Sequence, residues 1–220
     1  MSDLFRIAII GKGNVGSNLG IHLTGLGFHI KFGVREGSEV LRVLSRCHGR
    51  AEALPVNEAI EWSDIVFLAI PYASVKDVLP AFKGTKGKVI VDCTNPITWE
   101  DGPVWNPPKE GSVAAMIAAE LPNVRVVKGF NTFGAEFMRD PSVGSMPVDV
   151  LIAGDEDARR TIEEFAIAAK FNPIDAGPLR NAATLENMGI LWIHLATIGG
   201  FGRTHAFRFV DRSEHRSVSI

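Results

Sequence analysis

A glycine-rich segment near the start of the chain has the spacing of a phosphate-binding loop. The residues are Gly11-Lys12-Gly13-Asn14-Val15-Gly16, and they follow an apolar run and precede a helical pattern. In that context the first glycine permits a tight turn, the second lets the backbone approach a pyrophosphate, and the third lets the helix pack on the strand. The helix start offers free N–H groups to the anion. The segment therefore predicts a dinucleotide site.

The end of the second predicted strand indicates which dinucleotide is bound. NAD sites place an acid about 20 residues past the first glycine, on the ribose 2′-hydroxyl. This chain has Arg35 there, and a guanidinium donates two hydrogen bonds to a 2′-phosphate. Lys12 either adds positive charge beside the phosphate loop or is a solvated surface lysine. Glu36 would serve NAD if it turned inward, but an acid suits a helix start, so NADP(H) is the expected cofactor.

Three further strand ends are expected at the same crevice. Ligands of open α/β sheets lie at the carboxyl ends of the strands. The residues expected to flank the cofactor on this ground are Ile70, Pro71, Tyr72, Asn95, Asn131 and Thr132. Amides and hydroxyls orient a ring by hydrogen bonds and are poor acids, so no catalytic acid or base is predicted. Hydride transfer between stacked rings requires orientation more than acid–base groups.

The other reactive side chains are interpreted as structural. Tyr72 and Lys76 match a Tyr-x-x-x-Lys pair, but they follow the fourth strand too early for the catalytic pair of short-chain dehydrogenases. Cys93 is expected to be a small core residue. His194 and His205 are either contacts of an acceptor or hydrogen-bonded core residues. The six histidines are scattered and the two cysteines lie far apart, so no metal site is expected.

The elements that position these residues alternate between short β-branched runs and helical patterns, which predicts a parallel sheet covered on both faces. The expected strands are Phe5–Ile10, His29–Val34, Ala51–Leu54, Ile65–Ile70, Val89–Asp92, Arg125–Lys128, Val148–Ala153 and Pro173–Asp175. The expected helices are Asn14–Leu26, Ser38–Arg46, Val56–Trp62, Ser74–Phe82, Ser112–Glu120, Glu156–Lys170 and Thr184–Ile198. Residues 96–111 are rich in Pro, Gly and Trp and are expected to form a long loop.

The fold class is therefore α/β, a doubly wound Rossmann fold with a mostly parallel sheet. We expect residues 1–147 to form the NAD(P)-binding domain. Residues 148–220 are expected to form a strand-helix-strand-helix extension that completes the acceptor site and a dimer surface. The helix within Leu185–Phe201 is apolar nearly all round, so something must cover it. It either closes over the acceptor or packs against a second subunit, and a homodimer is expected.

Composition restricts the classes of partner. The chain has 220 residues, of which 46% are hydrophobic and 22% charged, and its net charge is −2. This balance is typical of a globular protein and has no basic footprint for nucleic acid. Cys47 and Cys93 are too few for a disulfide framework, which indicates a reducing compartment. Without a visible secretory signal or membrane span, a cytoplasmic location is expected.

Several motifs together resemble the family of NADPH-dependent reductases of coenzyme F-420. They are GKGNVG at 11–16, the Arg after the second strand, VDCTNP at 91–96, VKGFNTFGAE at 127–136, LIAGD at 151–155 and DAGPLRNAATLENMGILWI at 175–193. The reductase domain of six-transmembrane metalloreductases is also similar. The family's usual Ser before the Arg is Val34 here, and its common Thr in the glycine loop is Lys12, which is expected to replace the lost phosphate contact.

The resemblance implies hydride transfer between NADPH and a flavin-like ring stacked on the nicotinamide, near Asn131, Thr132 and the C-terminal helix. Coenzyme F-420 or a flavin is the acceptor it implies. Two alternatives stay open. One is an NADP(H)-sensing module that binds a partner through the C-terminal helix without turnover. The other is a small imine or β-hydroxyacid reductase, although such enzymes usually carry a long all-helical second domain.

Overall fold

A computed structural model describes residues 5–35 and 39–210. Its centre is an eight-stranded sheet with the order β12-β11-β8-β5-β4-β1-β2-β3. All neighbouring strands are parallel except β11 and β8. The strands are β1 Ile7–Ile10, β2 Ile30–Val34, β3 Ala51–Pro55, β4 Ile65–Leu68, β5 Val89–Asp92, β8 Arg125–Lys128, β11 Asp149–Gly154 and β12 Asn172–Asp175. The expected doubly wound Rossmann fold is confirmed.

The order of the strands places a crevice at the carboxyl ends of β1 and β4. From β1 the sheet grows outward through β2 and β3, and the chain then returns to build β4, β5 and β8 on the other side of β1. Ligands of open α/β sheets bind where the order reverses in this way. Every residue of β1, β4 and β5 is buried, as expected of apolar strands covered on both faces.

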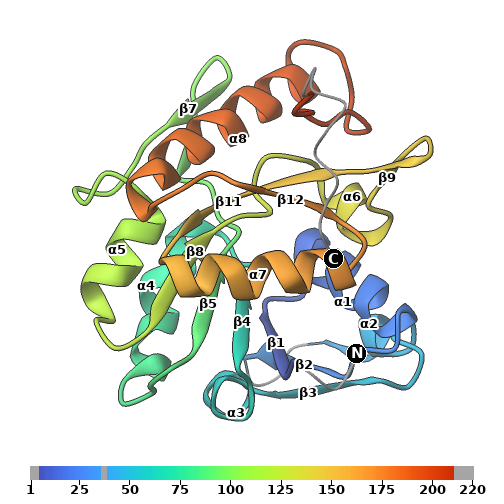
Figure 1. Ribbon diagram of the computed structural model, residues 1–220, viewed down its shortest axis with the longest axis vertical. Helices are drawn as coiled ribbons and strands as arrows, with labels where there is room; N and C mark the ends of the chain where they lie inside the picture. Colours follow the sequence, from blue (N-terminus) through green and yellow to red (C-terminus); the bar gives the residue numbers. More distant parts are fainter. Residues whose placement is uncertain (1–4, 36–38, 211–220) are drawn as a thin grey trace.

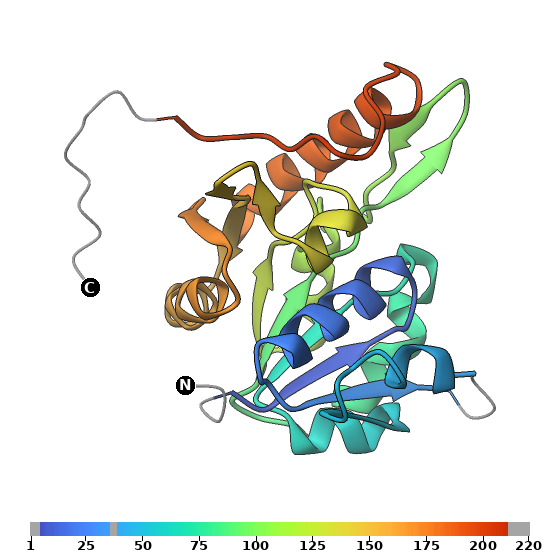
Figure 2. The ribbon, with the colours of Figure 1, turned by 90° about the vertical axis from the view of Figure 1, so that its right-hand side faces the viewer.

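Helices cover both faces of the sheet (Figures 1 and 2). One core cluster contains side chains from α1 (Asn14–Gly25), α6 (Ala135–Arg139) and α7 (Glu156–Ala168). Phe165 of α7 lies at its centre, with Phe67 and Phe130 at ring-centroid distances of 5.2 and 6.3 Å. The second cluster contains side chains from α3 (Val56–Trp62), α4 (Val75–Val78) and α5 (Val113–Glu120).

The structure differs from the expected elements in five features. Residues 96–111 contain a hairpin of β6 (Ile97–Trp99) and β7 (Pro103–Trp105) rather than a plain loop. A second hairpin, β9 (Ser142–Val143) with β10 (Met146–Pro147), and α6 were not expected. The helix expected over 74–82 is broken into η2 (Tyr72–Ser74), α4 and η3 (Leu79–Phe82), where Pro80 supplies no N–H. Only Leu41–Leu44 is helical as α2, and the expected start at Ser38 lies outside the described residues.

The C-terminal part of the chain adds β11 and β12 to the sheet and then forms a helix that contacts β7 and β11. After β12, the short η4 (Leu179–Asn181) leads into α8 (Ala182–Thr197). Figure 2 shows α8 beside the β6–β7 hairpin and away from α3. The segment after α8 turns back, and Ala206 pairs with Phe133 in an isolated antiparallel bridge. Among the described residues, no helix has the length and apolar character that a membrane span requires.

Candidate functional site

The glycine loop has the geometry of an anion site. Gly11 has φ +111°, and a Cβ there would lie 2.4 Å from the Ala69 carbonyl oxygen. A Cβ on Gly16 would lie 2.2 Å from the Gly11 oxygen, so this glycine is required for close packing of α1 on the loop. Gly13 has open space around its Cβ position and precedes α1 without a side-chain cap. The first N–H groups of α1 are therefore available to a phosphate.

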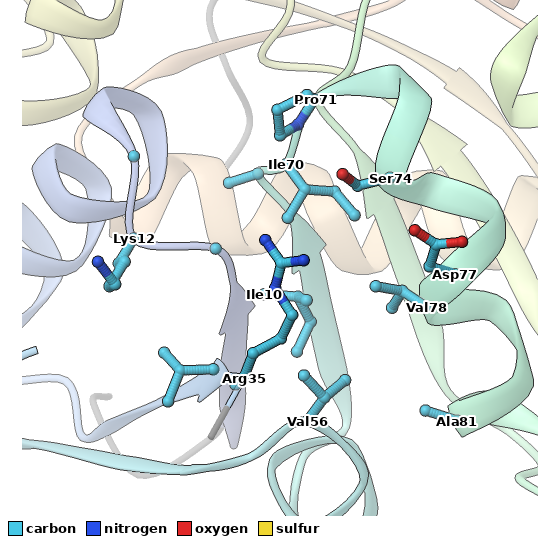
Figure 3. A pocket seen from close by; sticks show the side chains of 15 residues that line it. Ile10, Lys12, Arg35, Val56, Ile70, Pro71, Ser74, Asp77, Val78 and Ala81 are labelled. Atoms are coloured by element: carbon cyan, nitrogen blue, oxygen red, sulfur yellow. The ribbon is translucent and has the colours of Figure 1, made fainter. Parts of the chain in front are cut away.

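A cavity of about 430 Å³ lies beside the loop, between the ends of β2 and β4 and helix α4 (Figure 3). Its wall is mainly apolar, and Arg35 lies within it. In Figure 3 the Arg35 guanidinium points into the space between Ile10 and Ile70. This combination suits an adenine ring, because a guanidinium stacks on an aromatic face and apolar side chains cover the other face. The labelled lining residues are Ile10, Lys12, Arg35, Val56, Ile70, Pro71, Ser74, Asp77, Val78 and Ala81.

A second cavity, of about 450 Å³, lies on the other side of the β1 and β4 ends. It shares Gly13, Ala69, Ile70 and Pro71 with the first cavity. The two cavities are therefore two parts of one crevice that passes the phosphate loop. The second is lined by backbone and small groups on one side and by the C-terminal part of the chain on the other. These lining residues include Asn14, Val15, Cys93, Asn95, Asn131, Phe133, Trp192, Ile193 and Arg203.

Two asparagines join the strand ends in the second cavity to helix α8. Asn131 Nδ2 donates to Asn95 Oδ1 at 2.9 Å and to the Leu185 carbonyl at 2.9 Å, while Asn95 Nδ2 donates to the Asn131 carbonyl at 3.0 Å. Gly189 allows this approach, because a Cβ there would lie 2.5 Å from Asn95 Oδ1. Asn131 Oδ1 is buried and has no partner among the described residues.

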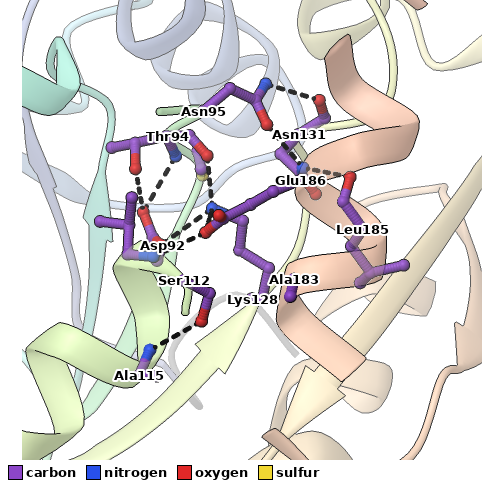
Figure 4. A network of polar contacts seen from close by, with 12 residues as sticks. Asp92, Thr94, Asn95, Ser112, Ala115, Lys128, Asn131, Ala183, Leu185 and Glu186 are labelled. Carbon is purple, nitrogen blue, oxygen red and sulfur yellow. Dashed lines mark hydrogen bonds and ion pairs between the residues drawn. The ribbon is translucent and has the colours of Figure 1, made fainter. Parts of the chain in front are cut away.

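Behind the asparagine pair lies a buried charge cluster (Figure 4). Lys128 Nζ is 2.9 Å from Asp92 Oδ2 and 3.1 Å from Glu186 Oε1, and all three side chains are fully buried. Asp92 Oδ1 also accepts hydrogen bonds from the N–H and hydroxyl of Thr94. Such charges are tolerated in the interior only when they are paired and hydrogen-bonded. The cluster ties the ends of β5 and β8 to α8.

Glu186 extends this connection to two more elements. Its Oε1 accepts from the Val113 N–H at 2.8 Å and its Oε2 from Trp105 Nε1 at 3.3 Å. Burial is the main cause that raises the pKa of Glu186, with Lys128 opposing it. One side chain of α8 thus contacts β8, the start of α5 and the β6–β7 hairpin. These contacts fix the position of α8, which lines the second cavity with Trp192 and Ile193.

The sequence did not reveal this cluster. Its residues predict a strand that ends at Lys128, a strand end at Asp92 near the crevice and a helix at Glu186, but no contact among the three. The signal was present, because a charged residue inside an apolar strand or helix requires a buried partner. The spacing gave no means to pair the three, since they lie on β5, β8 and α8.

Most of the predicted site residues line one or both of the first two cavities, and three do not. Gly11, Lys12, Gly13 and Arg35 line the first cavity, Asn14, Val15, Asn95 and Asn131 line the second, and Ile70 and Pro71 line both. Gly16 lies under the loop. Tyr72 and Thr132 line neither cavity. Tyr72 is half-buried on η2, where burial raises its pKa, and Thr132 is buried.

The remaining reactive residues are structural or peripheral. Cys93 is buried, and this burial raises the pKa of its thiol, which agrees with a core role. His194 is exposed near the β6–β7 hairpin and is not a hydrogen-bonded core residue. His205 stacks on Trp192 at 5.2 Å, and neither of its ring nitrogens has a partner among the described residues. Within those residues no group of three metal-ligating side chains occurs.

Comparison with protein families and with solved structures agrees with this geometry. A family model described as "NADP oxidoreductase coenzyme F420-dependent" matches residues 6–96. A crystal structure from Arthrobacter sp. FB24, described as a "putative f420 dependent nadp-reductase", has a TM-score of 0.83 and 26% identity. The similarity covers 94% of this chain and 100% of that one.

Two other relatives are longer than this chain. Metalloreductase STEAP3 of Rattus norvegicus is 27% identical over 213 residues, which cover 93% of this chain and 42% of that protein. A reductive aminase from Aspergillus terreus, solved with NADPH4, has a TM-score of 0.66 over 90% of this chain and 63% of its own. Its 18% identity supports the fold alone. Together the comparisons bear out the resemblance that was inferred from the sequence.

Proposed function

We propose that this chain, which resembles the F420-dependent NADP oxidoreductases, transfers a hydride between NADP(H) and a flavin or deazaflavin ring such as that of coenzyme F-420. The crevice supports a definite placement of the dinucleotide. The adenine fits the apolar cavity beside Arg35, and the pyrophosphate fits the uncapped start of α1. The nicotinamide then extends into the second cavity, toward Asn95 and Asn131.

The observation that carries the choice of acceptor is the chemistry of the second cavity. Cys93 and Arg203 are the ionisable side chains among its described lining residues. Neither suits a proton donor, because burial raises the pKa of Cys93 and arginine stays protonated. Reduction of an aliphatic carbonyl leaves an alkoxide that requires a general acid. A flavin-type ring instead spreads the incoming charge over its own heteroatoms.

The walls of this cavity support a flat ligand. Phe133 and Trp192 line it with largely buried rings, and the Trp192 ring is held by a hydrogen bond from Nε1 to the His205 carbonyl at 2.8 Å. Arg203 lies over the same ring, 5.9 Å from its centroid. NADPH supplies the hydride from its nicotinamide ring when bound. The role of the chain is to align the two rings and exclude water.

Asn131 is proposed as the residue that orients the nicotinamide. Its Nδ2 is already committed to Asn95 and Leu185, so its unpartnered Oδ1 is left to accept a carboxamide N–H. A buried acceptor without a partner costs free energy, which the ligand would recover. No side chain is proposed as a general acid or base for the transfer.

A steady-state assay of NADPH oxidation tests the choice of acceptor. The panel contains coenzyme F-420, FMN, FAD, quinones, ferric chelates, a keto acid and a cyclic imine. Turnover with the deazaflavin or a flavin, and little with the keto acid or imine, is the expected result. Efficient reduction of the keto acid or imine with no flavin turnover would refute the proposal. Tight NADPH binding without turnover on any acceptor would favour the sensing module.

The outer face of α8 supports a second proposal, the homodimer. Leu191 on α8 and Ile198 at its C-cap are about half exposed, and Phe201, four residues beyond the helix, is 67% exposed. The opposite face of the same helix is buried and carries Leu185 and Trp192. The helix therefore closes the second cavity with one face and presents apolar surface with the other. We propose that a second copy covers this surface, and that the protein acts in the reducing cytoplasm indicated by its cysteine content.

A further inference from the structure

A third cavity, of about 390 Å³, lies on the far side of the phosphate loop, between α1 and the α2 segment. Lys12, Arg42 and Arg46 line it, together with Glu39. None of these three cations is ion-paired with a described residue. Three positive charges against one carboxylate leave a net charge of about +2 around this space.

The two arginines stand on an anchored segment. Val43 and Cys47, which alternate with them along the chain, are buried in the core beneath α2. Polar groups of α1 form the opposite wall, where Ser17 and Asn18 line the cavity. Like charges that face one space repel each other. The arrangement therefore favours an anionic occupant.

The third cavity adjoins the dinucleotide crevice. Lys12 and Gly13 line both this cavity and the one assigned to the adenine. The adenine ribose must lie at this shared wall, because it joins the base to the pyrophosphate at the start of α1. Arg35 follows β2 on the base side, and its guanidinium points into the base cavity (Figure 3). The oxygens of a 2′-phosphate that Arg35 does not reach require other partners.

We propose that Arg42 and Arg46, with Lys12, bind the ribose 2′-phosphate of NADP(H) in this third cavity and so select NADP over NAD. This inference rests on the proposed function. A phosphate monoester carries a charge of about −1.5 to −2 at pH 7 and has three acceptor oxygens. Guanidinium groups match these oxygens with paired donors. Arg42 and Arg46 are thus specificity-determining residues. They lie outside the end of β2, which usually carries the residues that distinguish NADP from NAD.

The test is a binding measurement without an acceptor, so that it does not depend on hydride transfer. Dissociation constants of NADPH, NADH, 2′,5′-ADP and 5′-AMP are measured for the wild type, Arg42→Gln, Arg46→Gln and the double variant. We expect the double variant to weaken NADPH and 2′,5′-ADP about 5- to 30-fold and to change NADH and 5′-AMP less than about 2-fold. Arg50→Gln, an exposed arginine just before β3, is the control and should change none of them.

Replacement of Glu39 is an independent test in which the affinity for NADPH should rise rather than fall. Glu39→Gln removes the negative charge from the same cavity and should strengthen NADPH binding about 2- to 5-fold, with NADH unchanged. An equal loss of NADPH and NADH affinity in the double variant, or no loss of either, would overturn the proposal. Failure of the wild type to bind NADPH would instead refute the proposed function.

Discussion

Replacement of Gly189 by alanine tests whether α8 and the asparagine pair form one unit. A new Cβ would lie 2.5 Å from Asn95 Oδ1 and 2.8 Å from the Asn131 carbonyl oxygen. These distances are well below van der Waals contact, so α8 must move or the amide pair must separate. Either outcome disturbs the hydrogen bond from Asn131 Nδ2 to the Leu185 carbonyl.

The expected effect is a balance between two opposing contributions. Alanine is favoured over glycine inside a helix by about 0.5–1 kcal/mol. Overpacking costs about 1–3 kcal/mol, and each broken hydrogen bond adds about 0.5–1.5 kcal/mol. We therefore expect Gly189→Ala to lower the free energy of unfolding by about 1–3 kcal/mol. The displaced Asn131 should also weaken NADPH binding.

The chain offers a matched control in a second helical glycine. A Cβ on Gly25, at the end of α1, would meet its nearest neighbour, His48 Nε2, at 3.5 Å, which is ordinary contact. Gly25→Ala should thus leave stability unchanged or raise it. Urea unfolding at fixed protein concentration measures both variants, and NADPH titration follows the site. If Gly189→Ala were as stable as Gly25→Ala and bound NADPH normally, the argument for a rigid contact at Asn95 would be wrong.

Three further predictions address the cofactor, the buried charges and the assembly. Arg35→Ala should weaken NADPH about 10- to 150-fold and NADH much less, as measured by titration; equal losses would show that Arg35 does not bind the 2′-phosphate. Burial raises the pKa of Glu186, so its contribution to stability is fully present below the unfolded pKa, near 4.3, and is lost as the pH rises through the folded value. In urea unfolding, the free energy of unfolding of Glu186→Gln should accordingly rise relative to that of the wild type between pH 4 and 8. A pH-independent difference between the two free energies would contradict this. Light scattering at micromolar concentration should give the mass of a dimer, and Ile198→Glu should shift it toward that of a monomer; a wild type that is already monomeric would exclude the proposed assembly.

The nucleotide-binding part of the fold was accessible from sequence because its signals are local. The apolar runs that became β1, β4 and β5 are short and buried on both faces, and the glycine spacing reports a loop geometry directly. The β6–β7 hairpin had such a signal too. Asp101-Gly102 lies between its strands, and an Asp-Gly pair is a common hairpin turn. The proline and glycine content of residues 96–111 obscured it.

The buried charge cluster of Asp92, Lys128 and Glu186, by contrast, has no local sequence signal that pairs its members. Asp92 and Lys128 end apolar strands, and Glu186 lies in a largely apolar helix, but the sequence does not show which partner neutralises each. Pairing depends on the order of strands in the sheet and on where α8 crosses, both of which are set by tertiary packing. The five residues of α6 are likewise too few for a helical period to be detected.

The two parts of the crevice come from different stretches of the chain. The first cavity is lined by residues 10–81, whereas the far wall of the second comes from residues 131–203. Substitutions in the later stretch would therefore alter the far wall of the second cavity while the lining of the first cavity, proposed for the adenine, stays as it is. Under the proposed function, such a division along the chain would allow the choice of acceptor to change without a change in the residues that hold the adenine.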